Sequence, residues 1–314
     1  MLCLILLLNI FSCHSLNPIT GLDYIGNGFN YQTGQSGLAP LFYLSYDHKQ
    51  QWTSPSGTTY DVPDQAFVHD HLMAYEITTQ GLYSSYSEFY TMHTESVSFS
   101  AGLDIGKIGF GFYYDQQLGF VRDQIRIGHS EFLHGTHWWS FYIMSMYPAY
   151  LLKLDPMFQS AIDYLPSSIE SPSDKQKVDE FIETFGNFYM HQGVLGAKVD
   201  YNSAFSETLA KTYGWDWVTT NYGFSFHYYL FNISAGGFSN QTDIYIDVAF
   251  SAASNSNVTF YGGDPALANI TSLSAWVATI EKFPTPINMT LNGIWTLISD
   301  EKKQQMLEEY ILNS

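Results

Sequence analysis

The stretch FIETFGNFYMHQGVLGAKVDY, residues 181–201, changes its hydrophobic period midway. Up to Met190 the apolar residues recur at spacings of one, three or four, which is typical of a packed helix. After Gly193 and Gly196 the pattern becomes strictly alternating, as in a strand. One side of that strand would carry Ala197, Val199 and Tyr201, and the other Lys198, Asp200 and Asn202. We therefore expect a helix, a glycine-marked bend and a strand with one apolar face and one face in water.

Three other segments alternate in the same way: residues 95–106, 221–230 and 243–250. Such strands form an antiparallel sheet with one face on a core, or hairpins with lipid on one side and water on the other. Periodicity does not separate the two, because about nine to eleven residues also suit a tilted strand that crosses a bilayer. The apolar candidates for membrane-facing positions are Val97, Phe99, Leu103, Ile105, Phe224, Phe226, Tyr228, Ile244, Ile246 and Val248. Helices are predicted at 155–164, at 174–185, around Trp276 and at 300–312.

The first 15 residues, MLCLILLLNIFSCHS, are an apolar run followed by small residues. This pattern predicts a signal peptide over residues 1–15, cleaved before Leu16. As a membrane anchor the run is too short, because a spanning helix needs about 20 residues. Both cysteines, Cys3 and Cys13, lie in this leader, so the mature chain would have neither a thiol nor a disulfide.

Five Asn-x-Ser/Thr sequons agree with passage through a secretory pathway. They fall in the last third of the chain, at Asn232, Asn240, Asn257, Asn269 and Asn288. We expect a glycoprotein that is secreted or held in a secretory vesicle. Weak internal boundaries and an apolar content of 46% favour one domain over residues 16–314.

Charge narrows the choice of partners. The chain has 12 basic and 30 acidic residues, a formal net charge of -18. This balance disfavours a nucleic-acid partner, which needs a basic surface, and simple electrostatic adsorption to anionic lipid.

Catalytic motifs are weak. The sequence has no Gly-x-Ser-x-Gly elbow or phosphate-binding glycine loop, and the mature chain would have no cysteine nucleophile. His69 with His71, and His134 with His137, have spacings that a metal could use, but a third ligand is not evident, so surface or turn histidines are expected. Glu180 and Glu183 fit a solvated helix face better than an acid/base pair. We therefore expect that the protein is not an enzyme and that it binds neither a cofactor nor a metal.

The stretch at 181–201 resembles the signature of the membrane-attack-complex/perforin (MACPF) family. Phe185, Gly186 and Tyr189 match its aromatic and glycine positions, and Gly193 and Gly196 match its later glycines. Residues 21–34 and 60–68 resemble the family's opening segments. FYGGDP at 260–265, with Gly262 and Gly263, resembles a later loop, and residues 274–298 resemble the closing Trp-containing helix and its continuation. The landmarks occur in the family's order over nearly the whole mature chain.

The resemblance implies an α+β fold with a bent, twisted antiparallel sheet and two helical clusters able to convert to β-hairpins, as in MACPF proteins and cholesterol-dependent cytolysins. The convertible regions would be residues 93–147 and 202–259, with the glycines above shaping the bend. The implied activity is assembly of a homo-oligomeric ring or arc on target membrane lipid and formation of a β-barrel pore. The protein would be membrane-associated after assembly. Val at both Gly193 and Gly196 is expected to impair assembly and leave secretion intact.

A secreted, non-lytic MACPF protein acting in adhesion, signalling or development is the alternative. Asn232 and Asn240 bracket the natural tip of a hairpin built from 221–230 and 243–250. A glycan at that tip would not cross hydrocarbon, because its hydroxyls would lose water without gaining partners. For either function, Trp138 and Trp139 are the first candidates for contact with a membrane interface.

Overall fold

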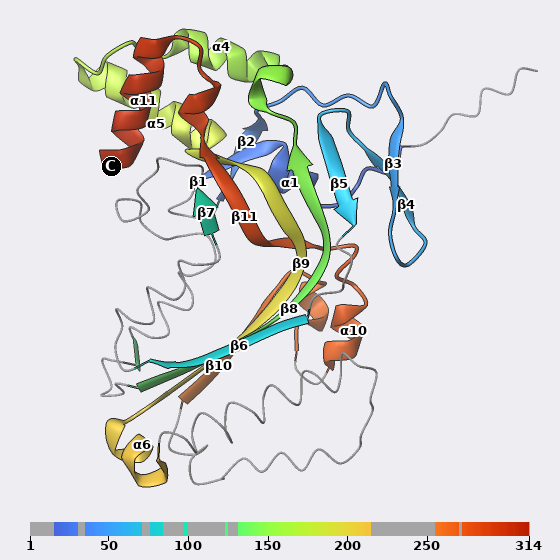
Figure 1. Cartoon of the computed structure of the whole chain (residues 1–314). Helices are drawn as coiled ribbons and strands as arrows, with labels where there is room; N and C mark the ends of the chain where they lie inside the picture. The colour runs from blue at the N-terminus through green and yellow to red at the C-terminus, as the bar shows by residue number, and fades with distance from the viewer. Residues whose placement is uncertain are drawn as a thin grey trace, which may run out of the picture.

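The computed structural model describes residues 16–30, 35–70, 76–83, 97–99, 123–124, 131–214, 255–269 and 272–313. Its elements are shown in Figure 1 and run in chain order as α1 (Leu22–Ile25), β1 (Asn27–Asn30), β2 (Gln35–Pro40), β3 (Gln50–Thr53), β4 (Thr59–Val62), β5 (Ala66–Asp70), β6 (Glu76–Tyr83), β7 (Val97–Phe99), β8 (Glu131–Met146), η3 (Ala149–Leu151), α4 (Pro156–Tyr164), α5 (Pro172–Phe185), β9 (Phe188–Phe205), α6 (Glu207–Tyr213), β10 (Asn255–Tyr261), η5 (Pro265–Leu267), α10 (Leu273–Val277), β11 (Thr285–Gly293), η7 (Ile294–Leu297) and α11 (Glu301–Asn313).

Two long strands, β8 and β9, form the spine of a nine-stranded sheet and pair antiparallel along their length. On the outer edge of β8, β5 pairs with residues 142–146 and β6 pairs with residues 132–139. On its other edge, β9 pairs with β11 in the upper half of Figure 1 and with β10 in the lower half. Strand β1 pairs with Phe188 and Tyr189 on the same edge of β9 as β8. The edge strands β2 and β7 extend the upper half, and β7 is parallel to β11. Strands β3 and β4 form a separate hairpin.

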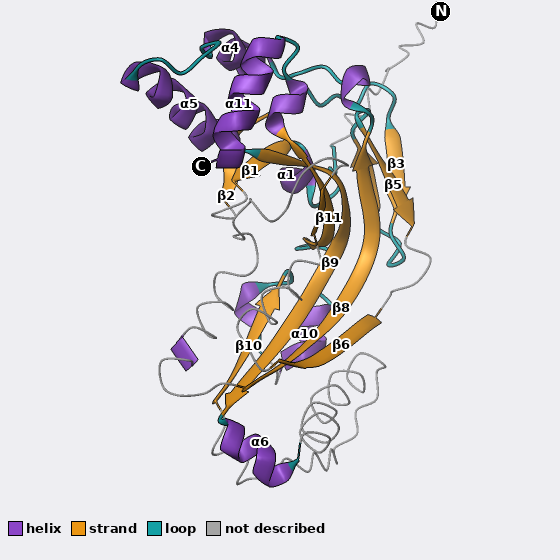
Figure 2. Cartoon of the chain, turned by 60° about the vertical axis from the view of Figure 1, so that its left-hand side comes forward, coloured by secondary structure: helices purple, strands orange, loops and turns teal. Residues whose placement is uncertain are grey.

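The sheet bends where both partners of β9 carry a bulge. The pairing of β8 with β9 shifts register between Ser140 and Tyr142, opposite Gly196 and Leu195. The pairing of β11 with β9 shifts between Pro286 and Asn288, next to the same position. Bulges bend a strand and increase its twist, and Figure 2 shows β8 and β9 curving through this region. The predicted bent antiparallel sheet is confirmed.

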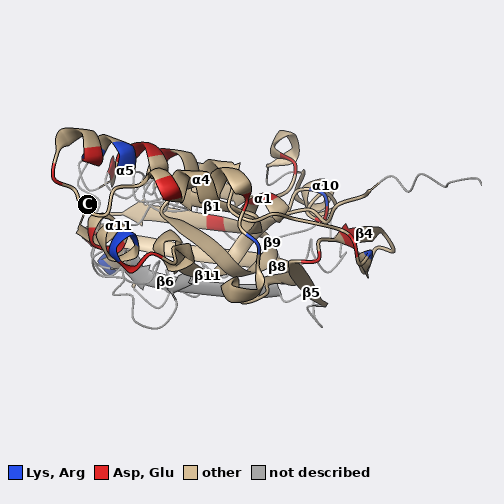
Figure 3. Ribbon diagram, turned by 90° about the horizontal axis from the view of Figure 1, so that it is seen from above, with Lys and Arg blue, Asp and Glu red and all other residues tan. Residues whose placement is uncertain are grey.

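Helices α4, α5 and α11 cover the upper end of the sheet (Figure 2). Helix α5 begins where the Ser171 side chain accepts a hydrogen bond from the Asp174 amide, with Pro172 at the first helical position. Its buried face carries Phe181 and Phe185, whose rings pack on Phe158 of α4. Acidic and basic residues lie side by side on α5 and α11 in Figure 3. Within the described ranges, no helix combines the length and apolarity needed to span a bilayer.

The boundary between helix and strand differs from the prediction. Helix α5 ends at Phe185, not near Met190, and β9 begins at Phe188. Gly186 stops the helix because its φ of +83° and ψ of −175° are accessible to glycine only. Phe188 and Tyr189 then pair with β1 and β11. The helical signals at 155–164, 174–185, Trp276 and 300–312 correspond to α4, α5, α10 and α11.

The polar side of β9 was expected to face water, and that expectation is wrong. Lys198, Asp200 and Asn202 are all buried, as are Ala197 and Val199 on the other side. The alternation correctly separates two chemically different faces. It does not reveal that both faces are covered.

Candidate hinge and membrane-insertion site

The predicted signature and the predicted opening segment meet backbone against backbone. A Cβ atom on Gly186 would lie 2.4 Å from the Phe29 nitrogen, and one on Gly28 would lie 2.1 Å from the Phe185 oxygen. The Asn187 amide donates to the Phe29 carbonyl at 3.0 Å, and the Ile294 amide to the Asn187 carbonyl at 3.1 Å. The two glycines therefore allow three distant segments to join at the start of β9.

The signature aromatics are core residues. The Phe185 ring lies 5.1 Å from that of Phe158, and the Tyr189 ring lies 5.6 Å from that of Phe42. The Tyr189 hydroxyl accepts a hydrogen bond from the Asn292 amide group at 3.1 Å. These residues fix the upper end of β9, and other residues form the bend.

At the bend, Gly196 packs against β8. A Cβ atom there would fall 1.9 Å from the Trp139 carbonyl oxygen, so only glycine fits without backbone movement. Gly193 is different, because its Cβ would meet the flexible end of Met190, with the sulfur at 2.5 Å. The two glycines were treated as equivalent in the sequence, and the structure separates them.

A tight turn at Gly262 and Gly263 ties α10 to this bend. Both glycines have positive φ, +76° and +64°, and Gly262 lies against the Gly196 carbonyl. Trp276 of α10 donates its indole N–H to the Gly262 oxygen at 3.0 Å. Its fully buried ring fills the space that a Cβ on Gly263 would need, and it packs edge-on against Trp139 at 5.5 Å. Predicted landmarks from three parts of the chain are thus assembled around one tryptophan.

The buried polar face of β8 and β9 lies beyond the bend. Lys198 Nζ and Asp200 Oδ2 form an ion pair at 2.9 Å, with side-chain exposures of 6% and 1%. His134 Nδ1 lies 2.7 Å from Asn202 Oδ1. Burial raises the pKa of Asp200, but the charge of Lys198 and hydrogen bonds from Lys198 and Thr136 oppose it, and the net pKa is lowered. Burial lowers the pKa of His134, so the ring is neutral at pH 7.

Some candidate residues lie elsewhere than predicted. His134 and His137 are buried in β8, not in a turn or at the surface. Trp139 is only 6% exposed and packs on α10, so in this conformation it offers no membrane contact. Glu180 and Glu183 are exposed on α5, as expected. Among the described side chains, no three of His, Cys, Asp or Glu are grouped to hold a metal ion.

Most of the predicted hairpin positions fall outside the described residues: Leu103, Ile105, Phe224, Phe226, Tyr228, Ile244, Ile246 and Val248. Val97 and Phe99 belong to β7, next to Met289 and Leu291 of β11. The two predicted convertible regions are too wide, because residues 131–146, 202–205 and 255–259 already form β8, the end of β9 and most of β10. What remains are two connections, residues 84–130 between β6 and β8 and residues 206–254 between β9 and β10.

Three of the five sequons lie in described parts of the chain. Asn269 is exposed just after η5, whereas Asn257 in β10 and Asn288 in β11 are partly buried. Asn232 and Asn240, on which the choice between the two functions depends, are outside the described residues.

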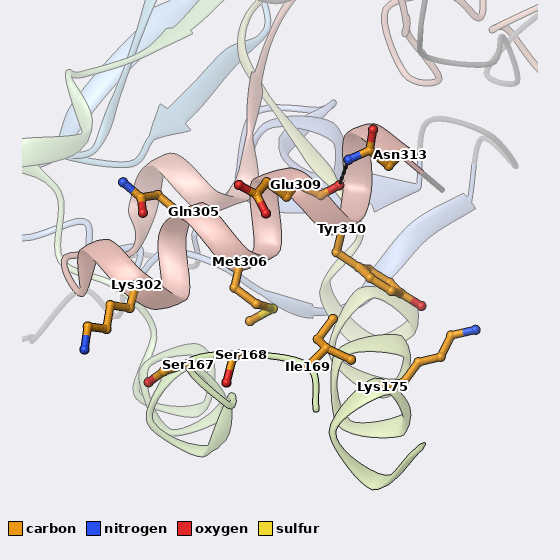
Figure 4. Close-up of a pocket in the computed structure, with 10 residues that line it drawn as sticks. All are labelled: Ser167, Ser168, Ile169, Lys175, Lys302, Gln305, Met306, Glu309, Tyr310 and Asn313. Atoms are coloured by element: carbon orange, nitrogen blue, oxygen red, sulfur yellow. Dashed lines mark hydrogen bonds between the residues drawn. The ribbon is translucent and has the colours of Figure 1, made fainter. Parts of the chain in front are cut away.

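A groove of about 700 Å³ opens between α11 and the chain that leads into α5 (Figure 4). Met306 and Ile169 approach each other across it, with Tyr310 beside them and Lys302 and Lys175 at opposite ends. The groove belongs to the upper helical layer, away from the bend.

Comparison with known proteins decides the family. The family model for the MAC/Perforin domain matches residues 15–313. The chain belongs to this MACPF family. It is 25% identical over 311 residues to the perivitellin-2 67 kDa subunit of Pomacea canaliculata, with 94% of the chain and 52% of that protein aligned. The chain therefore spans about half the length of the curated relatives it matches.

Solved structures show the same fold. GNIP1Aa from Chromobacterium piscinae superposes with a TM-score of 0.63 at 16% identity, over 94% of this chain and 55% of that one. Astrotactin-2, described as a vertebrate-specific, perforin-like membrane protein involved in neuronal development, superposes with a TM-score of 0.53 at 12% identity, over 95% and 45%. At these identities the likeness establishes the MACPF architecture alone.

Proposed function

We propose that this MACPF protein is secreted, assembles with copies of itself on a target membrane and forms a pore. One observation carries the proposal. Residues 84–130 join β6 to its antiparallel neighbour β8, and residues 206–254 join β9 to its antiparallel neighbour β10. Each long connection therefore leaves and re-enters the sheet between paired strands, at the same lower end (Figure 1).

This topology permits extension of the β6–β8 and β9–β10 pairs without a change in their own pairing, and in the first connection β7 must leave β11. If a connection became strand, its two halves would continue the register of β6 with β8, or of β9 with β10, as one longer hairpin. The alternation at 95–106, 221–230 and 243–250 supplies residues for such hairpins, with one side for lipid and the other for water. The backbone groups at the hairpin edges then need partner strands, which copies of the same chain supply.

A non-lytic role is the second candidate, and the sequons at Asn232 and Asn240 favour it. Glycans on the second connection would oppose its passage through hydrocarbon. The structural similarity to astrotactin-2, a perforin-like protein involved in neuronal development, shows that the fold occurs in a developmental protein.

The test is dye release from liposomes of several lipid compositions by the purified protein, with and without its glycans, together with electron microscopy of the membranes. Release accompanied by rings or arcs is the expected result. The variants Asn232→Gln and Asn240→Gln should release dye at least as fast as wild type, with Asn269→Gln as the control at an exposed sequon. Intact liposomes under every condition, with full glycan occupancy at Asn232 and Asn240, would support the non-lytic role.

A further inference from the structure

A cluster of side chains ties the β3–β4 hairpin to the segment that follows α10. Glu281 Oε1 accepts hydrogen bonds from Ser54 Oγ at 2.7 Å and from Tyr60 Oη at 3.0 Å. Ser54 and Tyr60 are buried and belong to a hairpin that is separate from the nine-stranded sheet. The Glu281 carboxylate is therefore a direct link between this hairpin and the chain just behind α10.

The same cluster reaches the bend. The Glu281 carbonyl accepts a hydrogen bond from Thr20 Oγ1 at 3.0 Å, and the Thr20 carbonyl accepts one from Tyr142 Oη at 2.5 Å. Tyr142 is the residue of β8 that resumes pairing after the bulge. Its ring lies 5.0 Å from that of Trp52, which in turn stacks on Tyr60. The contacts close a ring from the hairpin through Glu281 and Thr20 to the bend and back.

The contacts of Glu281 can hold the β3–β4 hairpin against the segment that follows α10, and we call this set of contacts the clamp. Partial burial raises the pKa of Glu281, but hydroxyl donors from the hairpin outweigh burial and lower it overall, so the group is a carboxylate at neutral pH. Hydrogen bonds to a charged acceptor are stronger than those between neutral groups. They are lost together if the hairpin moves, because all of these donors lie between Ser54 and Tyr60.

We propose that Glu281 is a positioning residue for the opening of the bend. It anchors the end of the α10 segment to the hairpin. In this way it keeps Trp276 packed against the Gly262–Gly263 turn and keeps the sheet in its bent conformation. Displacement of the hairpin, whose turn at residues 55–59 is exposed, frees α10 and with it the bend. This inference rests on the proposed pore-forming function, because opening is the step that the clamp would time.

Hydrogen exchange of the soluble protein tests the clamp without any membrane. In Glu281→Gln, amides of 273–283 and 261–264 should exchange about tenfold faster than in wild type, while those of α5 stay unchanged. Glu281→Ala should show a larger effect in the same segments, and Glu183→Gln, which removes an exposed carboxylate on α5, should show none. Unchanged exchange in both Glu281 variants, or an equal rise throughout the protein, would overturn the proposal.

Liposome dye release tests whether Glu281 controls how soon the bend opens on a membrane. Glu281→Gln should shorten the lag before release and leave the final extent unchanged, and Glu183→Gln should behave as wild type. Equal lags for wild type and Glu281→Gln would contradict the clamp. If no protein releases dye from any liposome, the proposed pore-forming function fails, and the exchange experiment still decides whether Glu281 holds α10 in place.

Discussion

Gly186 lies directly on the backbone of Phe29, so close that a Cβ atom on Gly186 would fall 2.4 Å from the Phe29 nitrogen. This contact ends α5, starts β9 and fixes the opening segment of the domain beside the signature. Since the Gly186 backbone also has φ +83° and ψ −175°, both space and conformation exclude a side chain.

Gly186→Ala should therefore lower the free energy of unfolding by more than about 3 kcal/mol, because backbone strain alone costs about 1–3 kcal/mol and the clash adds to it. Denaturant unfolding followed by tryptophan fluorescence measures the loss. Gly57→Ala is the matched control, because Gly57 also has positive φ, +94°, but has no atom near the position of its Cβ. Equal losses in the two variants would show that the contact with Phe29 contributes nothing.

The two glycines of the predicted hinge should respond differently. Gly196→Ala should destabilise the fold by more than about 3 kcal/mol, because its Cβ would meet the Trp139 carbonyl. Gly193→Ala should cost about 1 kcal/mol or less, since the Met190 side chain can move. The expectation that Val at both positions spares secretion is therefore revised. Thermal unfolding of the single variants checks this, and equal melting temperatures would contradict it.

The buried ion pair gives a third prediction. Asp200→Asn should lower the free energy of unfolding by about 3–5 kcal/mol, because Lys198 remains buried without its carboxylate. The double variant Lys198→Met with Asp200→Leu should recover much of that loss, as neither charge is then buried. Denaturant midpoints of the three proteins provide the test. A double variant no more stable than Asp200→Asn would show that the pair itself, and not the isolated charge, sets the cost.

Acid should weaken the sheet through His134. Burial holds the pKa of His134 below its usual value of about 6.5 in the folded state, so the unfolded chain binds the proton more readily. Its stabilising contribution is thus complete above pH 6.5 and declines as pH falls toward the lowered pKa. His134→Gln should flatten the fall in unfolding free energy between about pH 7 and 5, and His69→Gln, at an exposed site on β5, should not. Identical pH profiles for wild type and His134→Gln would exclude this role.

The resemblance to the MACPF family predicted the bent sheet, and the strands and glycine landmarks could be placed because alternation and glycine spacing are local signals. The sequence did not locate the end of α5, since Phe188 and Tyr189 fit helical and strand spacing alike and a contact with Phe29, far away in the chain, decides between them. It also missed the burial of Lys198 and Asp200, because alternation distinguishes two faces without showing what covers them. The Glu281 cluster left no sequence signal, since its members Thr20, Ser54, Tyr60 and Tyr142 meet only in the fold.

The central claim is that the alternating segments enter the membrane as hairpins, and an environment-sensitive fluorophore tests it most directly. The chain has only Cys3 and Cys13, both in the predicted leader, so single cysteines at Val97, Ser98, Phe99, Ser100 and Leu103 could be labelled cleanly. On liposomes, the account predicts that emission shifts to the blue at Val97, Phe99 and Leu103 and stays unchanged at the two serines. Emission that does not alternate along this segment, on liposomes that nevertheless bind the protein, would contradict it.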